Sequence, residues 1–299
     1  MKLVFLGTSA AQPTENRSLS CICLEREGEV LMFDAGEGTQ ISYLKSGLGW
    51  NKKMKIFVTH MHGDHCIGIL GLLQTMTLQH RTESIQIFGP DGIEQFLGEN
   101  IRILQFGMSF PVFISSVNPG VVCEERSFTI YAEKAEHSVL AYSYKFVEKD
   151  KPGKFDRETA LRLGIPEGPL WHELQIGKEV RIGEKKFFPS QVVGKNRPGK
   201  KIGISGDTRP TKSLEEFFRD CDYLSFDCTF SDSLRDKAIE TGHSTAKEAA
   251  TLAKNANVKN LILTHFSARH KNEDELAKEA SSIHKSVVAA KDLLSIEVK

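Results

Sequence analysis

The residues with the clearest chemical potential lie in one short run, Thr59-His-Met-His-Gly-Asp-His65. Three imidazoles and one carboxylate so close together indicate a metal site, because imidazole nitrogen and carboxylate oxygen are zinc ligands. A catalytic zinc also keeps one position open for water. A solvated polar loop is the alternative interpretation. A strand, a turn and a helix are all expected around the run, and this context favours metal binding.

The elements expected around this run divide its side chains into two pairs. Residues 55–58 predict a buried strand. On the extension of that strand, side chains two apart face the same way, so His60 and His62 are expected to reach one ion. Asp64 and His65 open a predicted helix and can reach a second ion, while the glycine between the pairs permits the reversal of the chain. The sequence therefore predicts a dinuclear metal hydrolase.

Length and composition suit an ordinary globular enzyme built from one large α/β domain or two. Of the 299 residues, 40% are hydrophobic, which is ample for a sizeable core. No apolar stretch approaches the roughly twenty residues needed to span a bilayer, and the first seven residues predict a strand rather than a signal peptide. We therefore expect a cytoplasmic protein with no membrane partner. The six cysteines lack disulfide or zinc-knuckle spacing, which predicts reduced thiols.

Single residues of ligand type follow other predicted strands. His137, Asp207 and His265 each come directly after a short apolar stretch. A lone histidine is more often structural than a ligand, but the shared placement predicts that these residues complete the metal site along one edge of packed sheets. Asp207 is the natural bridge, because its two oxygens could neutralise both ions. Between the strands, helices are predicted over residues 39–44, 65–79, 213–218, 244–254 and 273–290.

Residues 145–201 differ from the rest of the chain in composition. They are rich in proline, glycine and charge, which predicts an insertion with a short helix over 157–163. The segment holds fourteen Lys and Arg against eight Asp and Glu, within a chain that has 39 of each charge. A charge run is usually a solvated face, so composition alone leaves contact with nucleic acid open.

Motifs spread nearly from end to end of the chain point to a family. They are Phe5-Leu-Gly-Thr8 with Pro13-Thr14 and Arg17, Asp34-Ala-Gly-Glu-Gly-Thr-Gln40, Thr59 to His65, His137 with Tyr142, Gly164-Ile-Pro-Glu-Gly-Pro-Leu170, Ser205-Gly-Asp-Thr-Arg-Pro210, Gly242-His-Ser-Thr-Ala246 and Thr264-His-Phe-Ser-Ala-Arg269. The metal motif resembles that of the metallo-β-lactamase superfamily. The full combination resembles the ribonuclease Z family, the zinc-dependent endoribonucleases that remove the 3′ trailer from precursor tRNA.

This resemblance implies a fold and a ligand set. The fold would be a four-layer αββα sandwich, with residues 1–299 as a single domain and about 148–190 as an inserted flexible arm. Two Zn²⁺ ions per subunit are implied. The implied ligands are His60, His62 and His137 for one ion, Asp64, His65 and His265 for the other, and Asp207 as the bridge.

The resemblance also implies roles in the reaction. A bridging water would be acidified by the ions and would attack phosphorus as hydroxide, with Asp64 orienting it or taking its proton. His243 would contact the scissile phosphate and protonate the leaving 3′ oxygen. The cut would follow the discriminator nucleotide and leave a 3′ hydroxyl on the tRNA and a 5′ phosphate on the trailer.

In the family, the arm grips the elbow of the tRNA, and in a homodimer the arm of one subunit holds the tRNA that the other cuts. Binding through Lys and Arg is expected to weaken steeply with added salt. The candidate substrate contacts are Lys151, Lys154, Arg157 and Arg162 in the arm, and Thr208 and Arg269 outside it.

Three positions depart from the family pattern. Phe226-Asp227-Cys228-Thr229 replaces His-Glu-Ala-Thr, and Asp227 is expected to accept a hydrogen bond from His243 and hold its tautomer. Pro13-Thr-Glu-Asn-Arg-Ser18 replaces Pro-x-Lys-x-Arg-Asn in a loop that helps recognise the tRNA 3′ end, which bears on discrimination against a CCA terminus. Arg269 is followed by His270 rather than Tyr.

Two other functional classes fit parts of the sequence. A small-molecule phosphodiesterase or arylsulfatase of the same fold would use the same ions, and only the arm and the pocket would differ. Deleting residues 150–185 distinguishes this enzyme from a ribonuclease Z, because in the tRNA enzyme it would abolish tRNA cleavage but leave hydrolysis of a small diester intact. A non-catalytic RNA-binding relative would have lost ligands, whereas all seven are present here.

Overall fold

The chain divides into two compact units in a computed structural model that describes all residues from 1 to 299. The main unit comprises Met1–Glu124, Thr129–Phe146 and Lys201–Lys299. The inserted unit comprises Glu125–Phe128 and Val147–Lys200. Each unit has an apolar core of its own, so each is described separately below.

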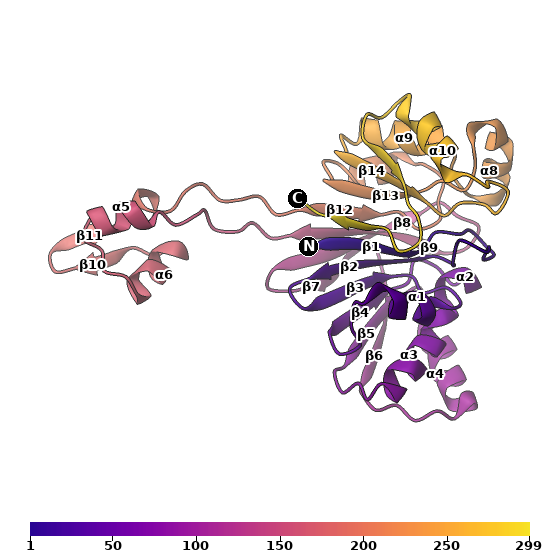
Figure 1. Cartoon of the computed structure of the whole chain (residues 1–299), viewed down its shortest axis with the longest axis horizontal. Coiled ribbons are helices and arrows are strands. Elements are labelled where there is room, and N and C mark those ends of the chain that lie inside the picture. Colours follow the sequence, from indigo (N-terminus) through magenta and orange to yellow (C-terminus); the bar gives the residue numbers. More distant parts are fainter. The chain divides into compact units, whose positions relative to one another are not determined.

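Two seven-stranded sheets form the centre of the main unit (Figure 1). The first sheet contains β16 (Ser295–Glu297), β1 (Lys2–Gly7), β2 (Cys21–Arg26), β3 (Glu29–Phe33), β4 (Lys53–Phe57), β5 (Ile85–Gly89) and β6 (Val112–Ser116), in that order. The second contains β15 (Val287–Ala289), β14 (Asn260–Thr264), β13 (Tyr223–Asp227), β12 (Lys201–Ile204), β9 (Ala141–Glu148), β8 (Phe128–Ala135) and β7 (Gly120–Glu124). Strands β3 to β6 run parallel, as do β12 to β15. The loops after parallel strands therefore collect at one edge of each sheet.

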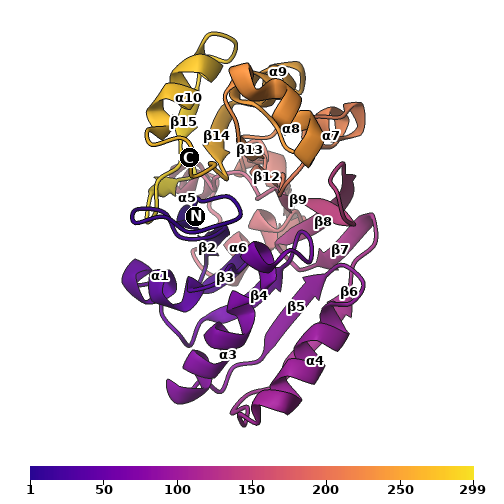
Figure 2. The same ribbon diagram turned by 90° about the vertical axis from the view of Figure 1, so that its right-hand side faces the viewer.

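Helices cover the outer face of each sheet (Figures 1 and 2). On the first sheet lie α1 (Thr39–Ser46), α3 (Gly68–Leu78) and α4 (Ile93–Leu104); on the second lie α7 (Lys212–Phe217), α8 (Arg235–Thr241), α9 (Ala246–Asn255) and α10 (Glu273–Ser281). A one-turn helix, α2 (Gly63–Cys66), precedes α3. The αββα order confirms the fold class expected from the sequence. None of these helices combines the length and apolarity needed to cross a membrane.

Aromatic rings fill the space between the two sheets. Phe33 and Phe57 from the first sheet stack with centroids 5.3 Å apart, and Tyr144 from β9 lies 5.6 Å from the Phe57 ring. All three are essentially inaccessible to solvent. The Tyr144 hydroxyl donates a 2.7 Å hydrogen bond to the carbonyl of Val58, directly after β4. This bond joins the sheets next to the segment that begins at Thr59.

The inserted unit contains α5 (Arg157–Arg162), α6 (Pro169–Gln175), β10 (Val180–Ile182), β11 (Lys185–Phe187) and the 3₁₀ turn η1 (Pro189–Gln191). Its core is built around Trp171, whose indole nitrogen donates to the carbonyl of Ile165 at 3.1 Å. Asp156 caps α5 by accepting from the Thr159 amide. The short helix expected over 157–163 is thus confirmed, one residue shorter.

The helix expected over 273–290 is wrong in its second half. Helix α10 ends at Ser281, and residues 287–289 form β15, which pairs in parallel with Leu261–Leu263 of β14. The intervening turn is held by His284, whose ring nitrogens lie 2.8 Å from the Val258 carbonyl and 3.0 Å from the Ser286 carbonyl. Helix-like spacing of apolar residues does not exclude a strand at the end of the segment, because β-branched residues such as Val287 can pair with an open sheet edge instead. Helix α9 likewise begins at Ala246, two residues later than expected.

We expect Tyr144→Phe to lower the free energy of unfolding of the main unit by about 1–2 kcal/mol, because it removes a buried hydrogen bond and leaves the Val58 carbonyl unpaired. Urea denaturation monitored by fluorescence measures this. Tyr223→Phe is the matched control, since its hydroxyl makes a long 3.4 Å contact at the surface. Its loss is expected to change stability by less than about 0.5 kcal/mol. Equal stabilities for the two variants would contradict the proposed link between the sheets.

Candidate metal centre

Seven ligand-type side chains meet where strands of the two sheets end. His60 and His62 follow β4, and Asp64 and His65 lie on α2. The other three are His137 after β8, Asp207 after β12 and His265 after β14. They form two groups in which the potential ligand atoms all lie within 4.8 Å of one another. One group is His60, His62 and His137; the other is Asp64, His65, Asp207 and His265.

Distances in the two groups are those of ligands around shared centres. In the first group, His62 Nδ1 lies 3.1 Å from His60 Nε2 and 3.3 Å from His137 Nε2. In the second, Asp207 Oδ1 lies 3.2 Å from His265 Nε2, and Asp64 Oδ2 lies 3.7 Å from the same nitrogen.

Asp207 connects the groups. Its Oδ2 atom is 3.3 Å from His65 Nε2 in the second group and 3.6 Å from His60 Nε2 in the first. The carboxylate is 3% exposed. One buried carboxylate therefore faces both sets of imidazoles, as expected for a bridging ligand.

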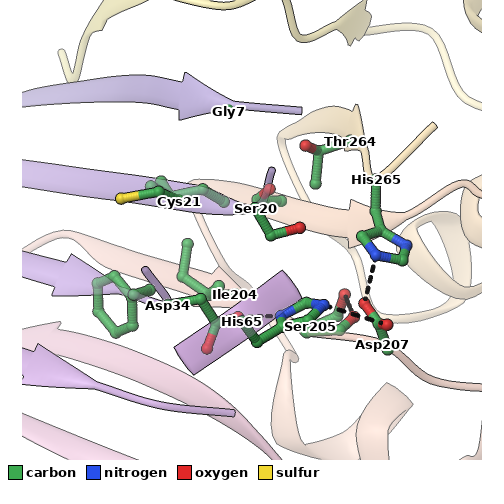
Figure 3. Close-up of a pocket in the computed structure, with 14 residues that line it drawn as sticks. Gly7, Ser20, Cys21, Asp34, His65, Ile204, Ser205, Asp207, Thr264 and His265 are labelled. Atoms are coloured by element: carbon green, nitrogen blue, oxygen red, sulfur yellow. Dashed lines mark hydrogen bonds and ion pairs between the residues drawn. The ribbon is translucent and has the colours of Figure 1, made fainter. Parts of the chain in front are cut away.

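Unpaired buried atoms indicate that the second group fits a cation. His65 Nε2, His265 Nε2 and Asp207 Oδ1 are buried and have no hydrogen-bond partner. A buried polar atom without a partner costs roughly 1–3 kcal/mol, so three in one place require an explanation. Figure 3 shows His65, Asp207 and His265 directed toward one another at the end of a small cavity between the sheets. Nitrogen and carboxylate oxygen in this arrangement suit a divalent metal such as zinc.

Outer contacts fix the orientation of the ligands. Asp34, directly after β3, accepts hydrogen bonds from the Thr59 amide at 2.7 Å and hydroxyl at 2.9 Å, and its Oδ2 lies 2.7 Å from His65 Nδ1. His65 is thereby turned so that Nε2 faces the cluster. His137 Nδ1 is held at 2.9 Å by the carbonyl of Gly242. Such partners fix the tautomer and ring position of metal-binding histidines.

The role of Asp34 was not predicted, although this residue begins one of the family motifs and directly follows β3. Its backbone φ is 60°, a left-handed value that is uncommon for aspartate. The only signal in the sequence was a polar residue directly after an apolar strand. The contact with His65 joins residues 31 positions apart, so only the fold reveals it.

Charge and burial set the protonation of the cluster. Burial, with the positive charge of His65 nearby, lowers the pKa of His60 to about 2, so its imidazole is neutral, the form that binds metal. Burial also opposes protonation of His65, but the charges of Asp207 and Asp34 outweigh it and raise the pKa. Burial disfavours the ionised form of Asp207, yet His265 and His65 hold its pKa well below the usual range. The carboxylate is therefore ionised and attracts a cation.

A histidine–aspartate pair lies beside the two groups. His243 Nδ1 is 2.9 Å from Asp227 Oδ2, and the His243 ring centroid lies 5.0 Å from that of His137 and 5.2 Å from that of His265. Asp227 is fully buried and accepts three further bonds, two from Thr229 and one from the Thr208 amide. Burial lowers the pKa of His243, but the charge of Asp227 outweighs it and raises the pKa to about 9.

Phe226, which stands where the family pattern has a histidine, does not lie beside His243 and Asp227. The Phe226 ring is fully buried in the core behind β13, 6.4 Å from the Phe218 ring. Because neighbouring residues on a strand face opposite sides, Phe226 points away from the site that Asp227 faces. The change at position 226 therefore removes no side chain from the cluster.

The remaining candidate residues are not gathered at the cluster. Thr208 is fully buried; its hydroxyl accepts from the Glu136 amide, and its own amide binds Asp227, so it supports the site rather than facing substrate. Arg269 is exposed and lines a cavity with Ala11, whose amide donates to Asp64 Oδ2 at 2.8 Å. Four candidates belong to the inserted unit, at its exposed or half-exposed surface: Lys151, Lys154, Arg157 and Arg162.

Comparisons with known proteins identify relatives of this chain. The chain is 67% identical over 299 residues to ribonuclease Z of Nitrosopumilus maritimus (strain SCM1), covering 100% of both chains. It is 39% identical over 299 residues to ribonuclease Z of Methanosarcina acetivorans, covering 100% of this chain and 98% of the relative. Residues 1–110 also match a family model described as anti-Pycsar protein Apyc1, a span that contains β1 to β5 and α1 to α4.

Solved structures show the same architecture. The short form of human tRNase Z is similar with a TM-score of 0.75 and 28% identity, covering 100% of each chain. The metallo-β-lactamase fold protein YhfI from Bacillus subtilis gives a TM-score of 0.69 over 99% of this chain and 98% of the other. At 18% identity, the second likeness concerns the fold alone.

We expect Asp34→Ala to weaken the binding of divalent metal by about 10- to 100-fold, because His65 loses the partner that orients it. Competition with a chromogenic chelator measures the affinity. The matched control is Asp222→Ala, which removes another buried carboxylate, one that binds the Lys201 amide away from the cluster. Its metal affinity should remain that of the original chain. A folded Asp34→Ala variant with unchanged affinity would show that His65 does not need this support.

Proposed function

The chain belongs to the ribonuclease Z family, and from this premise we propose how its residues remove the 3′ trailer from precursor tRNA. The activity is that of an endoribonuclease. The observation that supports the mechanism most directly is the cluster of seven ligands around Asp207, with the pair His243 and Asp227 beside it. Metal ligands and a proton donor together are what phosphodiester hydrolysis requires.

The cluster fits two zinc ions per subunit. His60, His62 and His137 would hold one ion, Asp64, His65 and His265 the other, and Asp207 would contact both. Bound zinc lowers the pKa of a coordinated water and neutralises charge on the phosphate, and so supplies the nucleophile at neutral pH. The ordered ligand set and the unpaired atoms of His65, His265 and Asp207 support this assignment.

Asp64 lies where it can orient the attacking water. The Ala11 amide holds its Oδ2 atom at 2.8 Å, and His65 Nε2 lies 3.5 Å from the same oxygen. Burial favours the protonated acid, but the imidazoles of His265 and His65, 3.7 and 3.5 Å from its Oδ2 atom, outweigh it and lower the pKa of Asp64. The carboxylate therefore stays ionised and can orient the attacking water by accepting a hydrogen bond from it.

His243 is the proton donor to the leaving 3′ oxygen. Its Nδ1 is engaged by Asp227, so Nε2 is the atom that can carry a proton to the substrate. The negative charge of Asp227 stabilises the protonated ring. Asp227 reaches His243 in spite of being one methylene shorter than glutamate. The products are a tRNA with a 3′ hydroxyl and a trailer with a 5′ phosphate.

The inserted unit is the part of the chain suited to hold tRNA. It has its own core, and Lys154, Arg157 and Arg162 are exposed on α5 or just before it. The segment 145–201 carries fourteen basic and eight acidic residues. We propose that these basic side chains bind the tRNA backbone, in a homodimer in which each arm serves the partner's site. We also propose a cytoplasmic location.

Removal of metal should abolish cleavage. Wild-type protein is incubated with an end-labelled precursor tRNA carrying a 3′ trailer, and the product is sized on a denaturing gel. We expect one cut after the discriminator nucleotide, complete loss of the cut after dialysis against chelator, and recovery when zinc is returned.

In the same assay, His243→Ala should lower the rate of cleavage by about 100- to 10,000-fold, because the leaving oxygen loses its proton donor. Asp64→Ala should abolish nearly all cleavage.

The control for the histidine variant is His80→Asn. His80 is exposed after α3 and has a left-handed φ of 56°, which asparagine tolerates. Its rate should equal that of the wild type. Full cleavage after removal of all metal, or by a folded His243→Ala variant, would be incompatible with the mechanism.

Removal of the arm should separate tRNA binding from chemistry. Lys151 and Arg197 pair in an antiparallel bridge, so deleting residues 151–197 removes the inserted segment between two neighbouring positions. Deleting only residues 150–185 would leave Phe187 and Val192 without the apolar core in which they pack. We expect the deletion to abolish tRNA cleavage at concentrations where the wild type is saturated. Hydrolysis of a small chromogenic diester should persist. Parallel loss of both activities would favour a small-substrate enzyme.

Mixing two inactive variants tests the homodimer. An arm-deleted subunit keeps its metal centre, whereas a His243→Ala subunit keeps its arm. If the arm acts on the partner's site, their mixture should recover up to about a quarter to half of wild-type cleavage after subunit exchange. A mixture of two preparations that share the same defect is the control and should stay inactive. No recovery despite dimers in light scattering would contradict action between subunits.

A further inference from the structure

Arg209 lies where three segments of the site meet. Its amide donates to the carbonyl of Glu136 at 2.9 Å, next to the ligand His137, and it follows the bridging ligand Asp207 by two residues. Its guanidinium donates through Nη1 to the main-chain carbonyl of His243. The side chain is 13% exposed. Arg209 thus contacts a residue next to the proposed ligand His137, lies two residues from the proposed ligand Asp207, and binds the main chain of the proposed proton donor His243.

Glu248 completes the connection. Nη1 of Arg209 donates to Glu248 Oε2 at 2.7 Å, and Nη2 donates to Oε1. Glu248 also accepts from the Thr245 amide at 3.1 Å, and the Thr245 hydroxyl accepts in turn from the Glu248 amide. This reciprocal cap at Thr245 starts α9 two residues after His243. A planar guanidinium can bind a carboxylate and a carbonyl at once in a fixed geometry.

Other contacts also hold the turn that carries His243, among them the Phe230 amide on the Ser244 carbonyl. The His243 backbone amide donates to the carbonyl of Ala238, and the Ser244 hydroxyl donates to the carbonyl of Thr208. Gly242, at φ 72°, leaves α8 in a left-handed conformation. Without Arg209, the His243 carbonyl loses a charged donor and Glu248 loses its bidentate partner. The imidazole could then shift relative to Asp227 and the metal cluster.

We propose that Arg209 is a positioning residue for the cleavage reaction, which ties the turn of His243 to the segment of Asp207 so that the imidazole stays aligned with the leaving oxygen. This inference rests on the proposed role of His243 as proton donor. Arg209 acts through His243 rather than on RNA, because its guanidinium is largely buried and engaged by groups of the chain itself.

A double-mutant cycle tests this coupling with single-turnover and steady-state cleavage of precursor tRNA. Arg209→Ala should lower kcat by about 10- to 100-fold, the usual cost of losing a supporting residue, with KM changed by less than about two-fold. In the His243→Ala background, Arg209→Ala should lower kcat by less than about two-fold further, because the group that it positions is gone. Equal losses in both backgrounds would overturn the proposal, as would an effect on KM alone.

Arg235→Ala is the matched control. Arg235 lies 3.2 Å from the same Glu248 oxygen, but its side chain is 62% exposed and it does not bind the His243 carbonyl. It should retain wild-type kcat. A loss equal to that of Arg209→Ala would show that only charge around Glu248 matters and would overturn the proposal.

Metal content and folding are measured on every variant. Arg209→Ala should bind as much metal as the wild type; metal loss proportional to the loss of kcat would place its effect on Asp207 and refute action through His243. If Arg209→Ala does not fold, Arg209→Lys enters the cycle, because it keeps a charge beside Glu248 but not the planar fork. The His243→Ala single variant reports separately on the proposed proton donor.

Discussion

The structure depends on one electrostatic constraint, a buried carboxylate that faces imidazoles from both sides. Asp207 lies within 3.6 Å of His60, His65 and His265, and one of its oxygens has no hydrogen-bond partner. An ionised group is costly to bury unless positive charge compensates it. A divalent cation would provide that charge and would also satisfy the nitrogens left unpaired around it. The sheets, the turns and the outer hydrogen bonds hold this arrangement together.

The fold meets this constraint by supplying ligands from loops and orienting them from strand ends. Asp34 and Asp227 each follow or end a strand, each is nearly inaccessible, and each fixes one histidine at the cluster, His65 and His243 respectively. Because both carboxylates accept several hydrogen bonds at once, neither can move without breaking a network. The precision of the site therefore comes from rigid sheet edges, although most of the ligands themselves lie on loops or short helices.

Chemistry and charge are divided between the two units. The main unit holds the seven ligand-type side chains and the proposed proton donor, and the inserted unit holds the segment in which basic residues outnumber acidic ones. A separate core around Trp171 allows the inserted unit to fold without contributing to the metal centre. Long-range electrostatic attraction tolerates distance, whereas bond cleavage requires exact placement, so the two tasks can be carried by separate parts of one chain.

By itself, the sequence predicted a metal site and, through the family resemblance, the layers of the fold. The run from Thr59 to His65 contains four ligands within seven residues, and such local spacing survives any tertiary arrangement. Only the tertiary structure decided the rest. Helix α10 ends at Ser281 because Val287 pairs with β14 at the edge of the second sheet. The fold also places Asp34 in contact with His65 and Arg209 in contact with His243. These contacts join residues 31 and 34 positions apart, and no local pattern encodes which distant polar groups a fold will place within hydrogen-bond reach.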